Sequence, residues 1–471
     1  MRRTKIICTI GPACSQPKKL EELILSGMEV ARINFSHGTH EEKSREIKQI
    51  RQISKKLNRQ ITILQDLCGP KIRVGEVENK EIYLKEGTTI TLTSKPQVSN
   101  NKTLFISYPY LAKDLYLKDS ILLDDGKLEL VVIKKIKDEI VCEVKRGGKL
   151  KSKKGVNFPS RSLSIPALTG KDILDVKFGL SEKVDVIALS FVRQADDIIK
   201  LCKLIRSLGG DIPIIAKIVK YEAIENLEKI LDVCDGIMVA RGDLGVEVPI
   251  ENIPIYQKLI IRKANEHGKP VITATQMLES MIENPTPTRA EVTDISNAIL
   301  DGTDAIMLSA ETSIGKYPVE AVKIMARIAE KTEEIINYPE LFKTRKIGSY
   351  QMIADAVAHG ACQMAYDLSA NALITFTSSG HTARLISKYR PHAPIYVFTT
   401  NDEVARKVNL YWGTRCFKIK EVKTTDEMFK HALDTAKKEK IIQKNDTVIL
   451  TAGIPVKEKA NTNLIRVVKV N

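Results

Sequence analysis

The sequence predicts an α/β protein built on a (β/α)8 barrel, with a small β-barrel lid domain inserted into it and an α/β domain after it. Runs of β-branched residues, each followed by an amphipathic stretch, recur eight times. A segment of alternating apolar and polar residues interrupts this series, and a second set of strand and helix patterns begins near Lys346. These three observations predict the three parts.

The eight predicted strands alternate with helical patterns, which favours a closed parallel barrel (a TIM barrel) over an open sheet. Such barrels place their chemistry at the C-terminal ends of the strands, so we look for site residues there. The predicted strands are Lys5–Ile10, Glu29–Asn34, Ile61–Asp66, Val184–Ser190, Pro213–Ile218, Gly236–Arg241, Pro270–Thr275 and Ala305–Ser309.

The predicted domains follow these patterns along the chain. Residues 1–69 and 166–345 form the barrel, and 70–165 form an antiparallel β domain between them. An insertion at a barrel mouth is suited to act as a lid. Residues 346–471 form an α/β domain, with strands starting at Ala372, Ile395 and Thr447.

Composition excludes several classes of protein. The 471 residues, 43% of them hydrophobic, can bury a large core. The net charge of +15 is spread along the chain without an aromatic-rich RNA-binding motif, so we expect small anionic phosphates as ligands and no nucleic acid. No apolar run is long enough to span a membrane. Eight scattered cysteines and the lack of a secretory signal favour the cytoplasm.

Polar side chains follow the second and third predicted strands. Arg32 offers a planar fork of donors suited to phosphate oxygens, and Asn34 and Ser36 offer neutral oxygen ligands for a hard cation. Asp66 ends the third strand, and Lys71 and Arg73 follow it at the lid hinge. Each alone is compatible with a surface salt bridge, but together at one rim they indicate a site.

The later strands add a second group of candidates. Lys217 leaves an apolar strand and could stabilise a phosphoryl group in transfer, or form an interior ion pair with a barrel carboxylate. Gly242 lets the backbone approach an anion, and Asp243 is a candidate ligand for a divalent ion. Thr275 places a hydroxyl at the rim, where it could hold a carboxylate or relay a proton.

Motifs along essentially the whole chain resemble those of pyruvate kinase. They are ARINFSHG, GPKIR, KKGVNFP, MVARGDLG, TATQMLESM, NPTPTRAE and MLSAET. The resemblance implies transfer of the phosphoryl group of phosphoenolpyruvate to ADP, giving ATP and pyruvate in glycolysis. It also implies Mg²⁺ or Mn²⁺ as cofactor and a homotetramer, with residues 346–471 as the domain for effector binding and oligomerisation.

The resemblance assigns roles to residues that match the family motifs. Arg32 and Arg73 would bind phosphates, Lys217 would stabilise the phosphoryl group, and Asp243 would hold the divalent ion. Gly242 and Thr275 would bind phosphoenolpyruvate. The implied nucleotide-binding residues are Thr9, Pro12, His37, Arg73 and Lys154. The implied monovalent-cation site is Asn34, Ser36, Asp66 and Leu67.

Two positions depart from the family pattern. Potassium-using members carry Thr and Glu where this chain has Leu67 and Lys71, so we expect the lysine ammonium to replace K⁺. The family's Lys-Ile-Glu is Lys217-Ile218-Val219 here, which removes one of two carboxylates expected on the divalent metal. Glu222 lies three residues beyond Val219 and is a candidate replacement.

The loop Thr377, Ser378, Ser379, Gly380, His381 and Thr382 lies between a predicted strand and helix. Its hydroxyls and amides suit a phosphate at the helix N-terminus, and the family uses this loop for sugar-phosphate or nucleotide effectors. Ordinary helix capping is the alternative.

Two other functions fit parts of the sequence. A catalytically impaired barrel, kept for effector binding or scaffolding, would explain Val219. A carbon–carbon lyase or aldolase would share the barrel. The retained site residues argue against the first, and the lid and third domain argue against the second.

Overall fold

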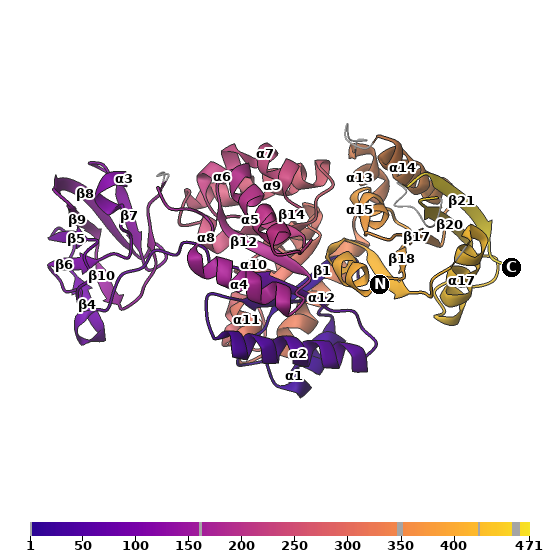
Figure 1. Cartoon of the computed structure of the whole chain (residues 1–471), viewed down its shortest axis with the longest axis horizontal. Helices are drawn as coiled ribbons and strands as arrows, with labels where there is room; N and C mark the ends of the chain where they lie inside the picture. The colour runs from indigo at the N-terminus through magenta and orange to yellow at the C-terminus, as the bar shows by residue number, and fades with distance from the viewer. Residues whose placement is uncertain (1, 160–162, 346–351, 423, 455–461) are drawn as a thin grey trace.

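The computed structural model describes residues 2–159, 163–345, 352–422, 424–454 and 462–471. Its three parts lie in a row, with the lid at one end, the barrel in the middle and the C-terminal domain at the other end (Figure 1). Among the described residues, no helix combines the length and apolar character needed to cross a membrane.

Eight parallel strands close into a barrel within the described residues, which confirms the predicted fold. The first strand pairs with the last, Lys5 opposite Ala305, and this pairing closes the ring. The sixth strand ends one residue earlier than predicted because Arg241 begins a helix. In chain order the strands are β1 (Lys5–Thr9), β2 (Val30–Asn34), β3 (Thr62–Asp66), β12 (Val186–Val192), β13 (Ile214–Ile218), β14 (Gly236–Ala240), β15 (Val271–Ala274) and β16 (Ala305–Leu308).

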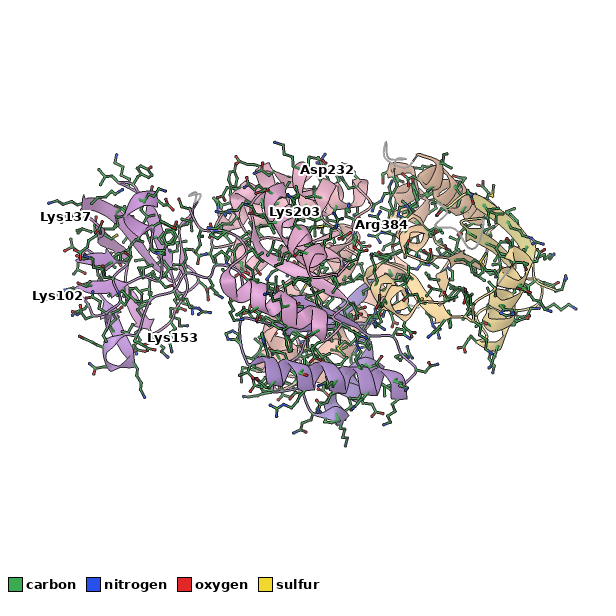
Figure 2. All side chains as sticks on the ribbon, in the orientation of Figure 1. Lys102, Lys137, Lys153, Lys203, Asp232 and Arg384 are labelled. Atoms are coloured by element: carbon green, nitrogen blue, oxygen red, sulfur yellow. The ribbon has the colours of Figure 1, made fainter. Side chains whose placement is uncertain are left out.

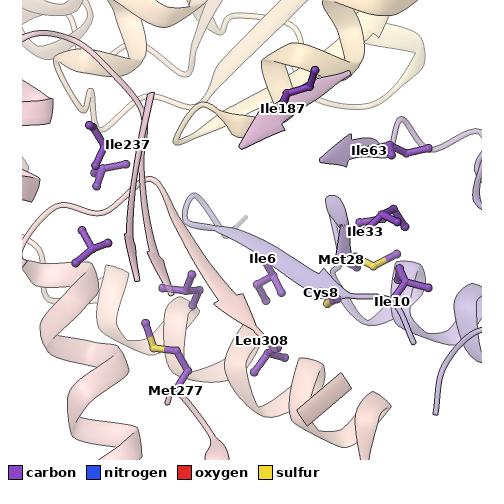
Figure 3. Close-up of a cluster of buried hydrophobic side chains, with 14 of the residues drawn as sticks. Ile6, Cys8, Ile10, Met28, Ile33, Ile63, Ile187, Ile237, Met277 and Leu308 are labelled. Atoms are coloured by element: carbon purple, nitrogen blue, oxygen red, sulfur yellow. The ribbon is translucent and has the colours of Figure 1, made fainter. Parts of the chain in front are cut away.

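Side chains alternate between two cores along each strand, as the pleat requires. On β1, Ile6 and Cys8 belong to the cluster that packs against the surrounding helices (Figure 3). Ile7 between them belongs to a second cluster, with Val30 and Leu64 of the neighbouring strands. This second cluster continues into the C-terminal domain, so the barrel interior and that domain share one core.

Three barrel helices begin at capping boxes, in which a Thr side chain and an acidic side chain three residues later bond to each other's backbone amides. The pairs are Thr39 with Glu42, Thr169 with Asp172, and Thr288 with Glu291. The barrel helices are α1 (Pro17–Ser26), α2 (His40–Lys56), α4 (Gly170–Ser181), α5 (Ala195–Ser207), α6 (Tyr221–Glu225), α7 (Leu227–Val233), α8 (Arg241–Leu244), α9 (Ile253–Glu266), α10 (Arg289–Leu300), α11 (Ala310–Ser313) and α12 (Pro318–Glu334), with 3₁₀ helices at Ile250–Asn252 and Glu279–Ile282.

The lid is inserted between β3 and β12 and has a hydrophobic cluster of its own, from Ile72 to Phe158. Most of its strand pairs are antiparallel, as predicted, but β5 and β6 pair in parallel. Its elements are β4 (Glu81–Leu84), β5 (Thr89–Thr93), β6 (Thr103–Phe105), α3 (Leu111–Asp114), β7 (Ser120–Leu123), β8 (Leu128–Ile136), β9 (Glu139–Arg146), β10 (Gly148–Lys151) and β11 (Val156–Asn157), with a 3₁₀ helix at Glu78–Lys80.

The C-terminal domain contains a sheet in the order β19-β18-β17-β20-β21, with the last strand antiparallel. The three predicted strands are present, and the structure adds β19 and β21. The domain start predicted at Lys346 lies outside the described residues. The elements are α13 (Tyr338–Thr344), α14 (Met352–Asp367), β17 (Ala372–Phe376), α15 (His381–Lys388), β18 (Ile395–Thr399), α16 (Asp402–Lys407), β19 (Thr414–Lys418), α17 (Thr425–Lys438), β20 (Thr447–Ala452) and β21 (Leu464–Lys469), with a 3₁₀ helix at Val408–Leu410.

Buried charges join this domain to the barrel face opposite the lid. Arg390 pairs with Asp304 at 2.7 Å, just before β16 begins. The ring of Trp412, the sequence's one tryptophan, has the guanidinium carbons of Arg390 and Arg3 at 4.9 and 5.3 Å from its centre. Trp412 is therefore positioned at the junction of the two domains.

Candidate active site

Three charged side chains from three strands meet at the barrel mouth. Asp66, at the end of β3, is 1% exposed. Lys217 on β13 places its Nζ 3.1 and 3.2 Å from the two Asp66 carboxylate oxygens. Arg32 on β2 donates from Nε to Oδ2 of Asp66 at 2.7 Å. The structure thus brings together three of the predicted site residues, and Lys217 also forms the interior ion pair considered as an alternative.

The two cations keep Asp66 ionised. Burial pushes the pKa of Asp66 upward, but Lys217 and Arg32 outweigh burial and hold that pKa below its usual value. One carboxylate therefore faces two positive charges, and the cluster carries a net positive charge. Such a preorganised cationic cluster suits an anionic group that gains charge during a reaction.

Two hydroxyls fix the cations further. Arg32 donates from Nη1 to the Oγ1 of Thr9 at 2.8 Å. Lys217 donates to the Oγ of Ser190 at 2.9 Å, and that hydroxyl donates to the Leu67 carbonyl at 2.7 Å. Ser190 was not among the predicted site residues. Its place at the end of the fourth predicted strand was the signal that could have identified it.

The loop after β15, at the same end of the barrel, is held in a strained conformation. Thr275 and Gln276 have positive φ values of 70° and 52°, a region that costs a non-glycine residue about 1–3 kcal/mol. Arg241 holds the loop by donating to the Thr275 carbonyl at 2.7 Å. The Gly242 amide donates to the Thr275 hydroxyl at 2.8 Å. The two predicted substrate-binding residues, Gly242 and Thr275, are therefore adjacent.

The expected divalent-metal residues are incomplete. Asp243 is exposed at the rim, whereas Val219 is 1% exposed and offers no oxygen. Among the described residues, no group of three or more His, Cys, Asp or Glu side chains could hold a metal ion. One Glu222 carboxylate oxygen is buried without a hydrogen-bond partner among these residues, and Glu222 is near enough to Glu247 to raise its pKa. That Glu222 replaces the missing carboxylate stays a prediction. The side chains present do not fit a divalent ion held by protein ligands alone.

A buried acid links the lid to the barrel beside Asp243. Glu247 pairs with Lys220 at 2.8 Å and accepts a hydrogen bond at 2.8 Å from Asn157 of the lid strand β11. Burial raises the pKa of Glu247, although Lys220 opposes the increase. Asp243, Lys220 and Glu247 line one cleft between lid and barrel. Lys220, Glu247 and Asn157 were not among the predicted site residues, although Asn157 lies in the KKGVNFP motif.

The predicted nucleotide residues do not line this cleft, and they come from both the barrel and the lid. His37 lies near Arg73 and Lys71 of the lid hinge. Partial burial lowers the pKa of His37, and the charges of these two residues lower it further. Arg73 donates to the Lys153 carbonyl at 2.7 Å. Lys154 instead pairs with Asp124 of the lid at 2.7 Å.

Thr9 and Pro12 lie at the end of β1 and just beyond it. Thr9 is buried and bonded to Arg32, whereas Pro12 is exposed. The structure therefore ties Thr9 to the charged cluster and leaves Pro12 at the surface.

The predicted monovalent-cation residues surround the same cluster. Asn34 accepts a hydrogen bond from the Ser36 amide at 3.0 Å, and Leu67 is buried. Asp66 is already bonded to Arg32 and Lys217, and Lys71 is exposed. That Lys71 replaces potassium stays a prediction.

The predicted effector loop precedes α15, as expected. The Thr377 hydroxyl accepts from the Gly380 amide at 2.8 Å, and the Thr382 hydroxyl bonds to that of Thr462 at 2.8 Å. Gly380 has a φ of 88°, which favours glycine. These internal bonds are those of a capped turn, so capping accounts for part of the motif.

A closed barrel with a cationic cluster at its mouth, facing an inserted lid, defines an enzyme that acts on anionic substrates. Comparisons with known proteins identify its family. Residues 1–322 match the pyruvate kinase barrel domain, and residues 355–468 match the pyruvate kinase alpha/beta domain.

Curated relatives agree over nearly the whole chain. Pyruvate kinase from Geobacillus stearothermophilus is 46% identical over 99% of this chain and 80% of its own length. Pyruvate kinase 2 from Synechocystis is 47% identical over 99% and 79%. Pyruvate kinase from Clostridium acetobutylicum is 42% identical over 99% of both chains. The chain belongs to the pyruvate kinase family and is a phosphotransferase.

The first prediction concerns Val219. Val219→Glu should restore a carboxylate beside Asp243 and tighten Mn²⁺ binding by about 2 kcal/mol, the scale for a close charge pair. Calorimetric titration with Mn²⁺ in the presence of phosphoenolpyruvate measures this change, and Mg²⁺ dependence of activity provides a second measurement. Val219→Gln is the control, because Gln has the shape of the introduced Glu without its charge. Equal metal affinities in wild type and Val219→Glu would show that Val219 is not a lost ligand.

Proposed function

We propose that the barrel mouth transfers the phosphoryl group of phosphoenolpyruvate to ADP, with Arg32 and Lys217 as the cations that act on it. The observation that carries this proposal is the buried cluster around Asp66. Asp66 holds both cations in place before substrate binds, so little reorganisation is needed during the reaction. Catalysis of phosphoryl transfer consists mainly of such positioning and electrostatic stabilisation.

Arg32 and Lys217 have different tasks in this proposal. The planar guanidinium of Arg32 binds phosphate oxygens by paired hydrogen bonds. The Lys217 ammonium neutralises charge on the phosphoryl group while that group moves from the oxygen of phosphoenolpyruvate to the oxygen of ADP. Ser190, which accepts from Lys217, positions that ammonium.

The second step protonates the enolpyruvate that remains. Gly242 and Thr275, whose groups are already bonded to each other, bind the substrate's carboxylate end. A threonine hydroxyl is a weak acid, so we assign Thr275 to orienting a water that delivers the proton. Arg241 positions this loop.

The nucleotide binds between lid and barrel, with Thr9, Pro12, His37, Arg73 and Lys154 as its proposed contacts. Lys154 now pairs with Asp124 inside the lid. Lid closure would move Lys154 from Asp124 to the nucleotide phosphates, which carry more charge than one carboxylate.

The divalent ion of the family, Mg²⁺ or Mn²⁺, would neutralise phosphate charge when bound. Asp243 is the one carboxylate proposed to hold it, with the remaining ligands coming from substrate and water. Asn34, Ser36, Asp66 and Leu67 are the proposed lining of the monovalent region, without bound K⁺.

A phosphorylated effector, a sugar phosphate or nucleoside monophosphate, is proposed for the loop Thr377–Thr382. We also propose a homotetramer in the cytoplasm. Exposed apolar side chains on α14, directly after it and on β21 support association. The cysteines of the described residues are free thiols, as in a reducing compartment. The exposed apolar side chains are Ile353, Met364, Tyr366, Leu368 and Val467.

The impaired barrel is the second candidate, and Val219 is the observation that favours it. The bonded cluster of Asp66, Arg32 and Lys217 favours an active enzyme. Burying charged groups costs free energy, so such a cluster is not expected to persist in a site that has lost its function.

The second prediction tests the role of Lys217. Lys217→Met should lower kcat by about 1,000-fold with little change in the KM for phosphoenolpyruvate, because the charge acts mainly in the transition state. A lactate-dehydrogenase-coupled assay measures both constants. The control is Lys203→Met, the same substitution at an exposed lysine labelled in Figure 2. A variant that loses only substrate affinity would contradict this role.

The third prediction concerns potassium. Activity in tetramethylammonium chloride should equal activity in KCl, because Lys71 supplies a permanent positive charge near the lid hinge. Lys71→Glu should make activity depend on K⁺ or abolish it, whereas Lys71→Gln tests loss of charge alone. Many-fold activation of the wild type by K⁺ would show that Lys71 does not replace the ion.

A further inference from the structure

The barrel strand β12 contains a β-bulge where it reaches the mouth. Leu189 and Val192 lie three residues apart, but their partners on β13 lie only two apart. Within this stretch Phe191 has a φ of 58°, in the left-handed region that is unfavourable for a bulky side chain. Bulges change the direction of side chains and are frequent beside active sites. We call residues 190–193 the β12 bulge.

Two segments of chain join the lid to the barrel (Figure 1), and the β12 bulge contacts both. The first segment starts at Gly69, which has a φ of 67°. A Cβ atom on Gly69 would lie 2.8 Å from the Cδ2 atom of the Phe191 ring, closer than side chains pack. The ring of Phe191 therefore lies directly against the backbone at the point where the chain enters the lid.

Arg193 binds the second segment, by which the chain leaves the lid. Its Nη1 donates to the Leu163 carbonyl at 2.5 Å, and its Nη2 donates to the Ile165 carbonyl at 2.6 Å. The backbone of Arg193 is fixed to the barrel, because its amide donates to the Asp197 carboxylate at 3.0 Å and its carbonyl accepts from the Asn226 side chain at 3.0 Å. A guanidinium anchored in the barrel thus holds the returning segment by two hydrogen bonds.

Ser190 connects the same bulge to Lys217. Its buried hydroxyl accepts from the Lys217 ammonium at 2.9 Å and donates to the Leu67 carbonyl at 2.7 Å. A serine hydroxyl has one proton to donate, and here that proton is already used. Any shift of the bulge must therefore move the Lys217 ammonium or lengthen its bond to Ser190.

We propose that the β12 bulge couples the position of the lid to the position of Lys217. Phe191 and Arg193 hold the two lid segments, and Ser190 passes their position to the ammonium. These three are positioning residues, since they act through Lys217. The ammonium is then held firmly beside Asp66 only while both lid segments are in place.

Such coupling has a chemical advantage, and here the inference rests on the function proposed for the mouth. A lid over the mouth excludes water, which would otherwise accept the phosphoryl group in place of ADP. If Lys217 loosens when the lid swings away, the charge that promotes transfer is withdrawn at the moment when water can enter. Hydrolysis of phosphoenolpyruvate is thereby suppressed.

The fourth prediction measures how firmly Lys217 is held in the full chain without substrates. Acetic anhydride acetylates accessible amines, and mass spectrometry compares Lys217 with the exposed Lys203 in the same sample. Ser190→Ala should raise the acetylation rate of Lys217 about tenfold, because it removes a hydrogen bond to a charged group. Arg193→Met should raise that rate by a similar factor, although its hydrogen bonds go to the lid segment. The matched control is Arg206→Met, at an exposed position on α5, which should leave the rate unchanged.

A double-mutant cycle on kcat tests whether Arg193 acts through Ser190. Ser190→Ala and Arg193→Met should each lower kcat about tenfold. The double variant should be little slower than Ser190→Ala alone, because no link then remains for the second change to break. A loss of about 100-fold, the product of two independent effects, would overturn the proposal.

Phe191→Ala tests the first lid segment and provides a second variant if Arg193→Met does not fold. It removes the ring from Gly69 and should also raise the acetylation rate of Lys217. An unchanged acetylation rate in either variant, with faster hydrogen exchange at residues 163–165 or 69–72, would show that the bulge only anchors the lid and would overturn the coupling.

The acetylation measurement does not depend on the reaction. Full kcat in Lys217→Met would contradict the proposed function, whereas the hold of the bulge on Lys217 is measured by acetylation alone.

Discussion

The pairing of β1 with β16 closes the barrel, and the site depends on that closure. It places Lys5 opposite Ala305 and bends the sheet until the strand ends form one ring. Arg32, Asp66 and Lys217 come from strands β2, β3 and β13, with β12 between the last two. In an open sheet the same side chains would spread over a wider edge, whereas the ring turns them toward one axis.

Charge is distributed on both faces of this ring. At the mouth, Asp66 offsets two cations and fixes their positions, which leaves a net positive charge for a substrate phosphate. At the opposite face, Arg390 is neutralised by Asp304, but Lys269, Arg384 and Lys407 line one recess together with a single carboxylate. Both faces therefore hold part of the chain's surplus of basic residues.

Much of the fold and part of the site could be predicted from the sequence. β-branched runs and capping residues are local signals, so the strands and many helix starts were predictable. Partners distant in the chain were not: Ser190 beside Lys217, Asn157 beside Glu247, and Lys269 near Lys407 are brought together only by packing. The sequence also left open whether Lys217 pairs with a carboxylate or acts on the substrate. The structure shows the pair with Asp66, and the role of Lys217 in the reaction stays a prediction.

The lid's separate hydrophobic cluster has a thermodynamic consequence. Apolar side chains from Ile72 to Phe158 pack among themselves, apart from the barrel clusters. Contacts such as Asn157 with Glu247 join lid and barrel through polar groups. Because the heat-capacity change of a transition tracks the apolar surface it exposes, opening and closing should carry a small heat-capacity change. The free-energy difference between the open and the closed lid should then vary almost linearly with temperature. Curvature in the temperature dependence of the enzyme's rate would therefore come from chemistry and substrate binding.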